Sequence, residues 1–263
     1  MIDALHWHPV DWSIVGPALV AGLLVLATHV PLGLQVLRKG IVFIDLAVAQ
    51  IAGLGVLVAG VAGFEPHGWE VQLCAGSAAL AGAGLLHWLE RRWPQSQEAL
   101  IGALFVVTSC VAILLLSGNP HGGEHLKDLL VGQILWVTPD QLWIMAALTL
   151  AVVLAWWQLP ARWAGAGFYV LFALAVTASV QLVGVYLVFS SLILPALAVQ
   201  RITDPRRRLA HGLALGSLAY LAGLVLSAML DLPSGALVVV VMAVVCLVGR
   251  ARSVPPEHAP GKP

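Results

Sequence analysis

Charged residues are scarce in this sequence of 263 residues. Asp, Glu, Lys and Arg make up 10% of the chain, whereas a soluble domain carries roughly 25%. Hydrophobic residues make up 60%, and the mean hydropathy is +0.95. Acidic and basic residues balance to a net charge of +0, so the basic excess typical of nucleic-acid binding is missing. The composition predicts a polytopic protein of the lipid bilayer.

Catalytic signatures are also absent. No HExxH, GxSxG or Walker A motif occurs, so we expect a protein that is not an enzyme, and an ATP-driven activity would need an ATPase on another chain. No covalently bound cofactor is expected. The first twelve residues contain no Lys or Arg, which argues against a cleaved signal peptide. Three cysteines lie singly in apolar segments, which excludes a disulfide framework or a zinc knuckle: Cys74, Cys110 and Cys246.

Eight apolar segments separated by polar breaks are the candidate membrane spans. Most are close to the ~20 residues that a helix needs to cross a bilayer. They predict an all-α protein with no separate soluble domain. The segments are 14–36, 41–62, 71–89, 98–117, 141–158, 166–200, 209–230 and 235–249.

The cationic residues between these segments predict the orientation, because short cytoplasmic loops are rich in Lys and Arg. Arg38, Arg91 and Arg162 follow the first, third and fifth segments, which places them on one side. The cationic stretch 201–208 joins that side only if 166–200 crosses the membrane twice. The prediction is therefore about nine crossings, with the N-terminus outside and the C-terminus in the cytoplasm.

The double crossing needs a reversal in the middle of the long segment. We expect the turn near Val183-Gly184-Val185 and a break of the returning helix at Pro195. Each half would be short, at about 14 to 17 residues, as in broken helices buried among neighbours. Residues 1–250 would form a single transmembrane domain, and residues 251–263 a disordered cytoplasmic tail.

Histidines gather near carboxylates in segments that this orientation places outside the membrane. His121, Glu124 and His125 lie together in NPHGGEHLKD. Imidazole and carboxylate suit Zn²⁺ and similar cations, so this loop is a candidate for metal capture. The alternative is that exterior loops are simply polar, and the glycines between the two histidines argue against a helical ligand pair.

Two ionisable side chains lie inside apolar segments. Asp45 lies in RKGIVFIDLAVAQIAGLG, where a charge costs on the order of 3 kcal/mol, so it either marks a transport pathway or pairs with Arg38 or Lys39. His29 lies two residues before Pro31. It is either a pathway ligand or hydrogen-bonded to a carbonyl that the proline leaves free.

Several segments resemble the permeases of zinc- and manganese-type ABC importers. RKGIVFIDLAVAQIAGLG is similar to the family's second span, in which arginines precede Gly-Asp and a His follows the Asp by four residues. LLVGQILWVTPDQL is similar to its Phe-Gly-Asp-Leu-Leu-x-Val-Thr stretch, and VGVYLVFSSLILPALAVQRITD to its Val-Gly-x-Leu-Leu segment that ends in Pro-Ala. EALIGALF resembles the family's fourth-span entry. The matches keep the family's order and cover most of residues 14–250.

The resemblance implies the permease bundle of an ABC importer in the bacterial inner membrane. It implies a second copy of the chain, with a translocation path at or near the dimer interface. A cytoplasmic ABC ATPase and a periplasmic or extracellular metal-binding protein would be its partners. The cargo would be a divalent cation moved by alternating access, with Zn²⁺ favoured over Mn²⁺ or Fe²⁺. The alternatives are the same fold with a non-metal cargo, or an accessory membrane protein without transport activity.

The sequence departs from the family at two ligand positions. The family's aspartate falls on Asp45, but its histidine falls on Ala49, and the Asp of its Gly-Asp stretch falls on Gln133. Gln50, Gln133 and His29 are then the secondary candidates along the pathway.

The loop QLPARWAGAG, residues 158–167, is shorter than the family's coupling segment for its ATPase. A shorter docking surface is therefore expected around Arg162. Arg201 and Arg206 are predicted to contribute to it from the same side of the membrane.

Overall fold

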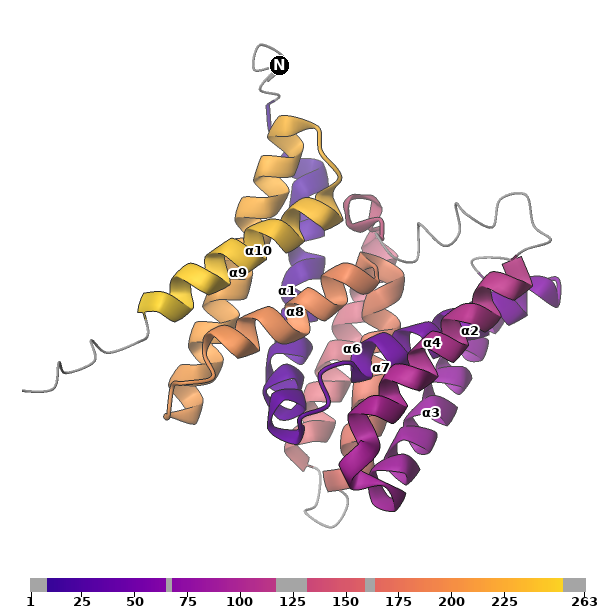
Figure 1. Ribbon diagram of the computed structural model, residues 1–263. Helices are drawn as coiled ribbons and strands as arrows, with labels where there is room; N and C mark the ends of the chain where they lie inside the picture. The colour runs from indigo at the N-terminus through magenta and orange to yellow at the C-terminus, as the bar shows by residue number, and fades with distance from the viewer. Residues whose placement is uncertain (1–8, 65–67, 117–131, 159–163, 253–263) are drawn as a thin grey trace, which may run out of the picture.

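The computed structural model describes residues 9–64, 68–116, 132–158 and 164–252. Within these ranges the chain forms nine α-helices and two 3-10 helices, and it has no strand (Figure 1). The all-α fold is thereby confirmed. The helices are α1 Trp12–Lys39, α2 Ile44–Val61, α3 Trp69–Arg92, α4 Gln97–Leu116, α6 Pro139–Gln158, α7 Ala164–Val183, α8 Val185–Ala198, α9 Pro205–Leu230 and α10 Ser234–Arg252, with η1 Pro94–Ser96 and η2 Ile134–Trp136.

Six of the described helices, α1, α2, α4, α6, α7 and α9, are long and apolar enough to cross a membrane. The helix α8 has 14 residues and is thus about 21 Å long, which is less than the ~30 Å of a bilayer's hydrocarbon core. Every predicted apolar segment contains a helix, and the nine helices of the described ranges comprise these six and three others: α3 with 24 residues, α8 with 14 and α10 with 19.

The long segment 166–200 consists of two helices, as predicted, and Gly184 separates them. The predicted length of about 14 to 17 residues is correct for α8 with 14 residues but wrong for α7, which has 20 residues and is long enough to cross a membrane. Its φ of 81° and ψ of 162° lie in a region that is essentially open only to glycine. The predicted break at Pro195 is wrong, because α8 continues through this residue to Ala198. A proline removes only one backbone donor, and α8 is packed against both α1 and α10.

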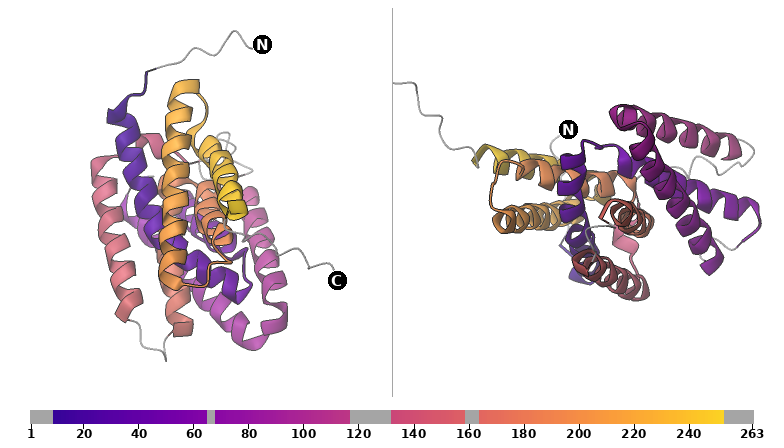
Figure 2. Two further views of the ribbon diagram at one scale, coloured as in Figure 1. Left: turned by 90° about the vertical axis from the view of Figure 1, so that its left-hand side faces the viewer. Right: turned by 90° about the horizontal axis from the view of Figure 1, so that it is seen from below.

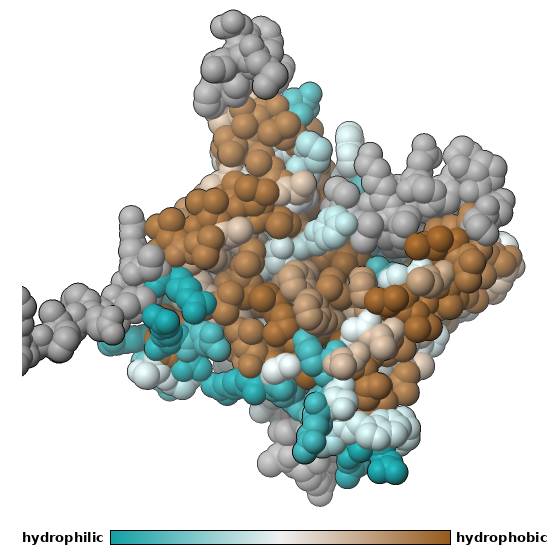
Figure 3. Space-filling model, in the orientation of Figure 1, coloured by the Kyte–Doolittle hydropathy of each residue, from teal (hydrophilic) through white to brown (hydrophobic). Residues whose placement is uncertain are grey.

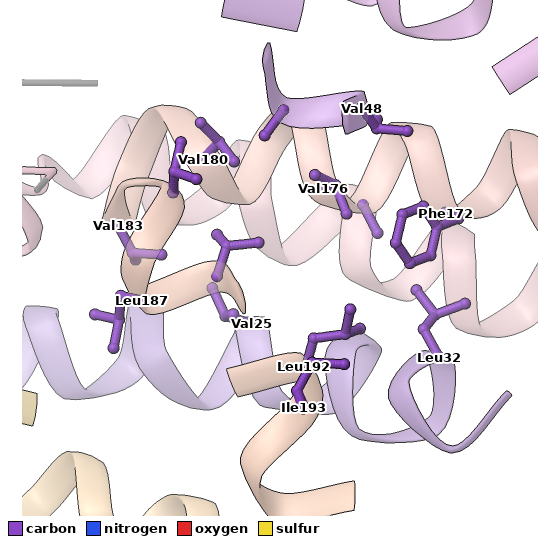
Figure 4. Packing of buried hydrophobic residues seen from close by; sticks show 14 of the residues in the cluster. Val25, Leu32, Val48, Phe172, Val176, Val180, Val183, Leu187, Leu192 and Ile193 are labelled. Carbon is purple, nitrogen blue, oxygen red and sulfur yellow. The ribbon is translucent and has the colours of Figure 1, made fainter. Parts of the chain in front are cut away.

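The hydrophobic core lies where α1, α2, α7 and α8 meet. Gly33 of α1 faces the backbone carbonyl of Leu192 so closely that a Cβ at residue 33 would clash with it. Such small residues let helices approach closely inside a membrane. Figure 4 shows the side chains of this core, among them Val25, Leu32, Val48, Phe172, Val176, Val180, Val183, Leu187, Leu192 and Ile193.

The helices fall into groups around α1. In Figure 2, seen from below, α2, α3 and α4 lie to one side of α1, and α9 and α10 lie to the other. The helix α8 runs across α1 (Figure 1). Hydrophilic residues gather along the lower edge of the surface in Figure 3, where Figure 1 places the end of α1, the end of α3 and the start of α9. The rest of this surface is mostly apolar, as expected for a face that meets lipid.

Candidate functional site

Asp45 lies in the first turn of α2 and is 1% exposed. Both of its carboxylate oxygens are buried without a hydrogen-bond partner among the described residues. The predicted pairing with Arg38 or Lys39 is not formed, because Lys39 Nζ bonds to Glu90 Oε1 instead and Arg38 is exposed. Of the two roles predicted for Asp45, the interfacial ion pair is therefore excluded by the geometry.

A second carboxylate, that of Glu98 in the first turn of α4, lies near Asp45. The backbone N–H of Phe43, two residues before Asp45, donates to Glu98 Oε1 at 3.3 Å. Glu98 Oε2 is also buried without a described hydrogen-bond partner. Glu98 was not among the predicted site residues, and the only signal for it was its place at the front of EALIGALF.

Gln50 lines a pocket of about 290 Å³ between α2, α4 and α8. The pocket is mostly apolar, and its other polar side chains are Ser109 and Tyr186. Ser109 Oγ donates to the Phe105 carbonyl at 2.8 Å, which leaves Gln50 and Tyr186 as the groups available to a polar guest. The remaining lining residues are Leu46, Phe105, Ile113 and Val185.

His29 is fully buried in α1. Its Nδ1 lies 2.9 Å from the Val25 carbonyl and 3.0 Å from Thr28 Oγ1, while Nε2 has no described hydrogen-bond partner. The carbonyl that Pro31 leaves free is that of Ala27, so the predicted bond to a proline-freed carbonyl is wrong. The His29 ring instead lies within hydrogen-bond distance of the Val25 carbonyl, one helical turn earlier.

Gln133 is exposed and lies far from Asp45. The residue before Gln133 packs against Gly184 at the end of α7. The start of α4, next to Asp45, is bonded to the start of α7, because Gln97 Nε2 donates to the Tyr169 hydroxyl at 2.7 Å. Tyr169 and Gly184 are about 22 Å apart along the axis of α7. The structure therefore does not bring Gln133 and Asp45 together.

Four of the predicted residues lie outside the described residues: His121, Glu124, His125 and Arg162. In the described part of the chain, no group of three or more His, Cys, Asp or Glu residues is arranged to hold a metal ion.

Arg201 and Arg206 are both exposed, in and just after the turn that joins α8 to α9. This turn is held firmly. The Asp204 carboxylate caps α9 by accepting from the Arg206 backbone N–H at 2.9 Å, and Arg208 Nε donates to the Ile202 carbonyl at 2.6 Å. The two arginines are thus presented on a fixed backbone.

A polar cluster, which we call the hub, joins the ends of α1, α3, α4 and α7. It consists of Lys39, His87, Glu90, Gln97 and Tyr169. His87 Nδ1 lies 3.5 Å from Glu90 Oε2, and Lys39 Nζ lies over the Tyr169 ring, 5.5 Å from its centre. Partial burial works to raise the pKa of Glu90, but the hydrogen bond and charge of Lys39 outweigh it and lower that pKa.

The described helices, six of which can cross a bilayer, define a multi-pass membrane protein. The model of the ABC 3 transport family matches residues 11–165 and 157–253. The chain belongs to this family and is a membrane-embedded permease of the ABC transporter type, as the resemblance predicted.

Individual relatives cover most of the chain. An uncharacterized membrane protein of Synechocystis, slr2045, is 26% identical over 271 residues, which are 95% of this chain and 94% of the relative. A Haemophilus influenzae protein described as a "Probable iron transport system membrane protein" is 24% identical over 63% of this chain and 67% of its own. PsaBC from Streptococcus pneumoniae in complex with Fab shares the fold, with a TM-score of 0.73 at 18% identity over 90% of each chain.

Proposed function

We propose that this chain is the permease subunit of an ATP-driven importer that moves a divalent metal cation across the bacterial inner membrane by alternating access. The observation that carries the proposal is Asp45, a carboxylate that is 1% exposed in a spanning helix and has no described partner. An ionisable side chain at such a place usually belongs to a transport path. Relatives described as metal or iron transport proteins support a metal cargo.

The proposed assembly contains a second copy of the chain, a cytoplasmic ABC ATPase and an extracytoplasmic metal-binding protein. The turn between α8 and α9, with Arg201 and Arg206, is the proposed docking surface for the ATPase, and Arg162 would extend it. The proposed orientation has the N-terminus outside and the C-terminus in the cytoplasm. It is supported by the gathering of hydrophilic residues along one edge of the molecule (Figure 3).

The family resemblance favours Zn²⁺ as the cargo, with Mn²⁺ and Fe²⁺ as alternatives. Gln50 and its pocket, together with His29 in the core of α1, are proposed to lie along the path beyond Asp45. The histidines and the carboxylate of the outer loop, His121, His125 and Glu124, are proposed to meet the cation before it enters.

Uptake of Zn²⁺, Mn²⁺ and Fe²⁺ by cells that express the chain with its ATPase tests this proposal. Replacing Asp45→Asn should abolish uptake of the cargo cation while the protein remains in the membrane. Asp140→Asn is the matched control, because Asp140 is an exposed carboxylate in the first turn of α6. If the Asp45 variant transports as well as this control, the proposed path is wrong.

A further inference from the structure

We propose that the end of α3 binds the phosphate headgroup of an anionic phospholipid, through the guanidinium groups of Arg91 and Arg92 and the indole rings of Trp88 and Trp93. This inference goes beyond the proposed function, because it concerns the lipid around the permease and neither the cargo nor the ATPase. The segments that carry the family resemblance do not include these four residues.

The cations at the end of α3 are free to meet an anion. Arg91 and Arg92 are exposed, and neither forms an ion pair with a described residue. The acidic side chain beside them, that of Glu90, bonds to Lys39 in the hub instead. The end of α3 therefore presents two positive charges that no described carboxylate offsets.

Two indole rings hold one of these cations in place. The Arg92 guanidinium lies over the Trp93 ring, with its Cζ 5.5 Å from the ring centre. The Trp93 ring in turn meets the Trp88 ring in a T-shaped contact, with 5.3 Å between their centres. A guanidinium that stacks through its face keeps the N–H groups of its edge available, and their spacing matches the oxygens of a phosphate. The rings thus fix a donor edge that suits a phosphate.

The backbone beyond α3 is fixed as well. The Trp93 N–H donates to the Leu89 carbonyl at 2.8 Å, and the Ser96 N–H donates to the Trp93 carbonyl at 3.1 Å. Trp93 leaves the helical conformation, with φ of −138° and ψ of 65°, and Pro94 begins η1. The Trp93 ring is therefore carried by an ordered turn and not by a loose end of the helix.

The position of these residues fits a lipid headgroup. The end of α3 lies at the hydrophilic edge of the molecule, next to the apolar surface (Figures 1 and 3), and tryptophan is enriched at this boundary in membrane proteins. Leu80, Gly84 and Trp88 are exposed at intervals of four residues, so they share one face of α3, and the space beside Gly84 is open. An acyl chain can lie along this face while its phosphate meets Arg91 and Arg92.

A purely electrostatic role for the two arginines makes a different prediction. They could serve only to balance the negative end of the α3 dipole and to attract anionic lipids in a diffuse way, as any cation at a membrane surface does. Such an effect depends on charge alone and needs neither an indole ring nor a guanidinium. Trp93→Leu and Arg92→Lys keep the net charge, so they separate a headgroup site from general attraction.

The test measures binding of phosphatidylglycerol to the purified full chain in detergent by native mass spectrometry, with phosphatidylcholine as the neutral lipid. We expect one tightly bound phosphatidylglycerol per chain. Its affinity should fall at least about tenfold in the double variant Arg91→Gln/Arg92→Gln and about threefold in Trp93→Leu and in Arg92→Lys. The matched control is Arg201→Gln/Arg206→Gln, which removes two exposed arginines from the turn between α8 and α9 and should have a smaller effect.

Thermal unfolding of each variant in phosphatidylcholine nanodiscs excludes misfolding as the cause of lost binding. An equal loss of affinity in the two double variants, or wild-type affinity in Trp93→Leu and Arg92→Lys, would reduce the effect to diffuse charge and overturn the site. Displacement of the lipid by an equal concentration of inorganic phosphate would place the ligand in solution and overturn the lipid assignment. ATPase co-purification that falls further with Arg91→Gln/Arg92→Gln than with the control pair would assign these arginines to the ATPase instead.

Discussion

Lys39 Nζ lies 2.5 Å from Glu90 Oε1, so a salt bridge joins the end of α1 to the end of α3. The same ammonium group lies over the ring of Tyr169 at the start of α7. Three helices are thereby tied together at one end of the bundle. The chain leaves this point through the turn at Gly40, whose φ is 70°, and enters α2 at Ile44, one residue before Asp45.

The first prediction concerns the pH dependence of stability. The pKa of Glu90 is lowered in the folded protein, so the salt bridge stabilises the fold above the ordinary pKa of a glutamate. This stability is lost as the pH falls through the lowered pKa. At neutral pH, Glu90→Gln should cost up to about 1 kcal/mol, because the pair is partly exposed and screened by solvent.

The measurement is the thermal unfolding midpoint of wild type and Glu90→Gln in nanodiscs. The two midpoints should differ at pH 7 and converge as the pH falls below the lowered pKa of Glu90. Asp140→Asn serves as a control for loss of an exposed carboxylate. A difference that is the same at both pH values would show that Glu90 stabilises the fold through packing and not through its charge.

The second prediction concerns the break between α7 and α8. Gly184→Ala places a Cβ on a backbone with φ of 81°, which should destabilise the protein by about 1–3 kcal/mol. Gly84→Ala is the control, because Gly84 lies inside α3 with open space around its Cα hydrogen, and alanine there should stabilise the helix by about 0.5–1 kcal/mol. The thermal unfolding midpoints of both variants and of wild type check these expectations. If Gly184→Ala unfolds at the same temperature as wild type, the break tolerates a side chain.

The third prediction concerns the ATPase-docking surface. Reversing charge with Arg201→Glu and Arg206→Glu should reduce co-purification of the ATPase and its stimulation by the permease. Arg91→Glu, an exposed arginine at the end of α3, is the control and should have a smaller effect. Undiminished ATPase capture by the double variant would place the docking surface elsewhere.

Much of the fold could be predicted because it depends on local properties of the chain. Long apolar segments define the helices, and the asymmetry of Lys and Arg required the reversal that the structure places at Gly184. The details that failed depend on packing between helices. The helix α8 continues through Pro195 in contact with α1 and α10, and the local sequence does not reveal these contacts.

The candidate site was predictable only in part. Asp45 stood out because it is a lone carboxylate in an apolar segment. Glu98 did not stand out, because an acid in the first turn of a helix is common. Its bond to the Phe43 N–H depends on the packing of α4 against α2. The partner of Lys39 is likewise 51 residues away in the sequence, which no periodicity predicts.

Uptake by the Asp45→Asn variant is the most direct test of the account. Initial rates of Mn²⁺, Zn²⁺ and Fe²⁺ uptake would be measured in cells with matched membrane levels of wild type, Asp45→Asn and Asp140→Asn. We predict that the cargo cation enters with wild type and Asp140→Asn, and that its uptake falls to background with Asp45→Asn. Wild-type uptake by Asp45→Asn would contradict a transport path through this carboxylate.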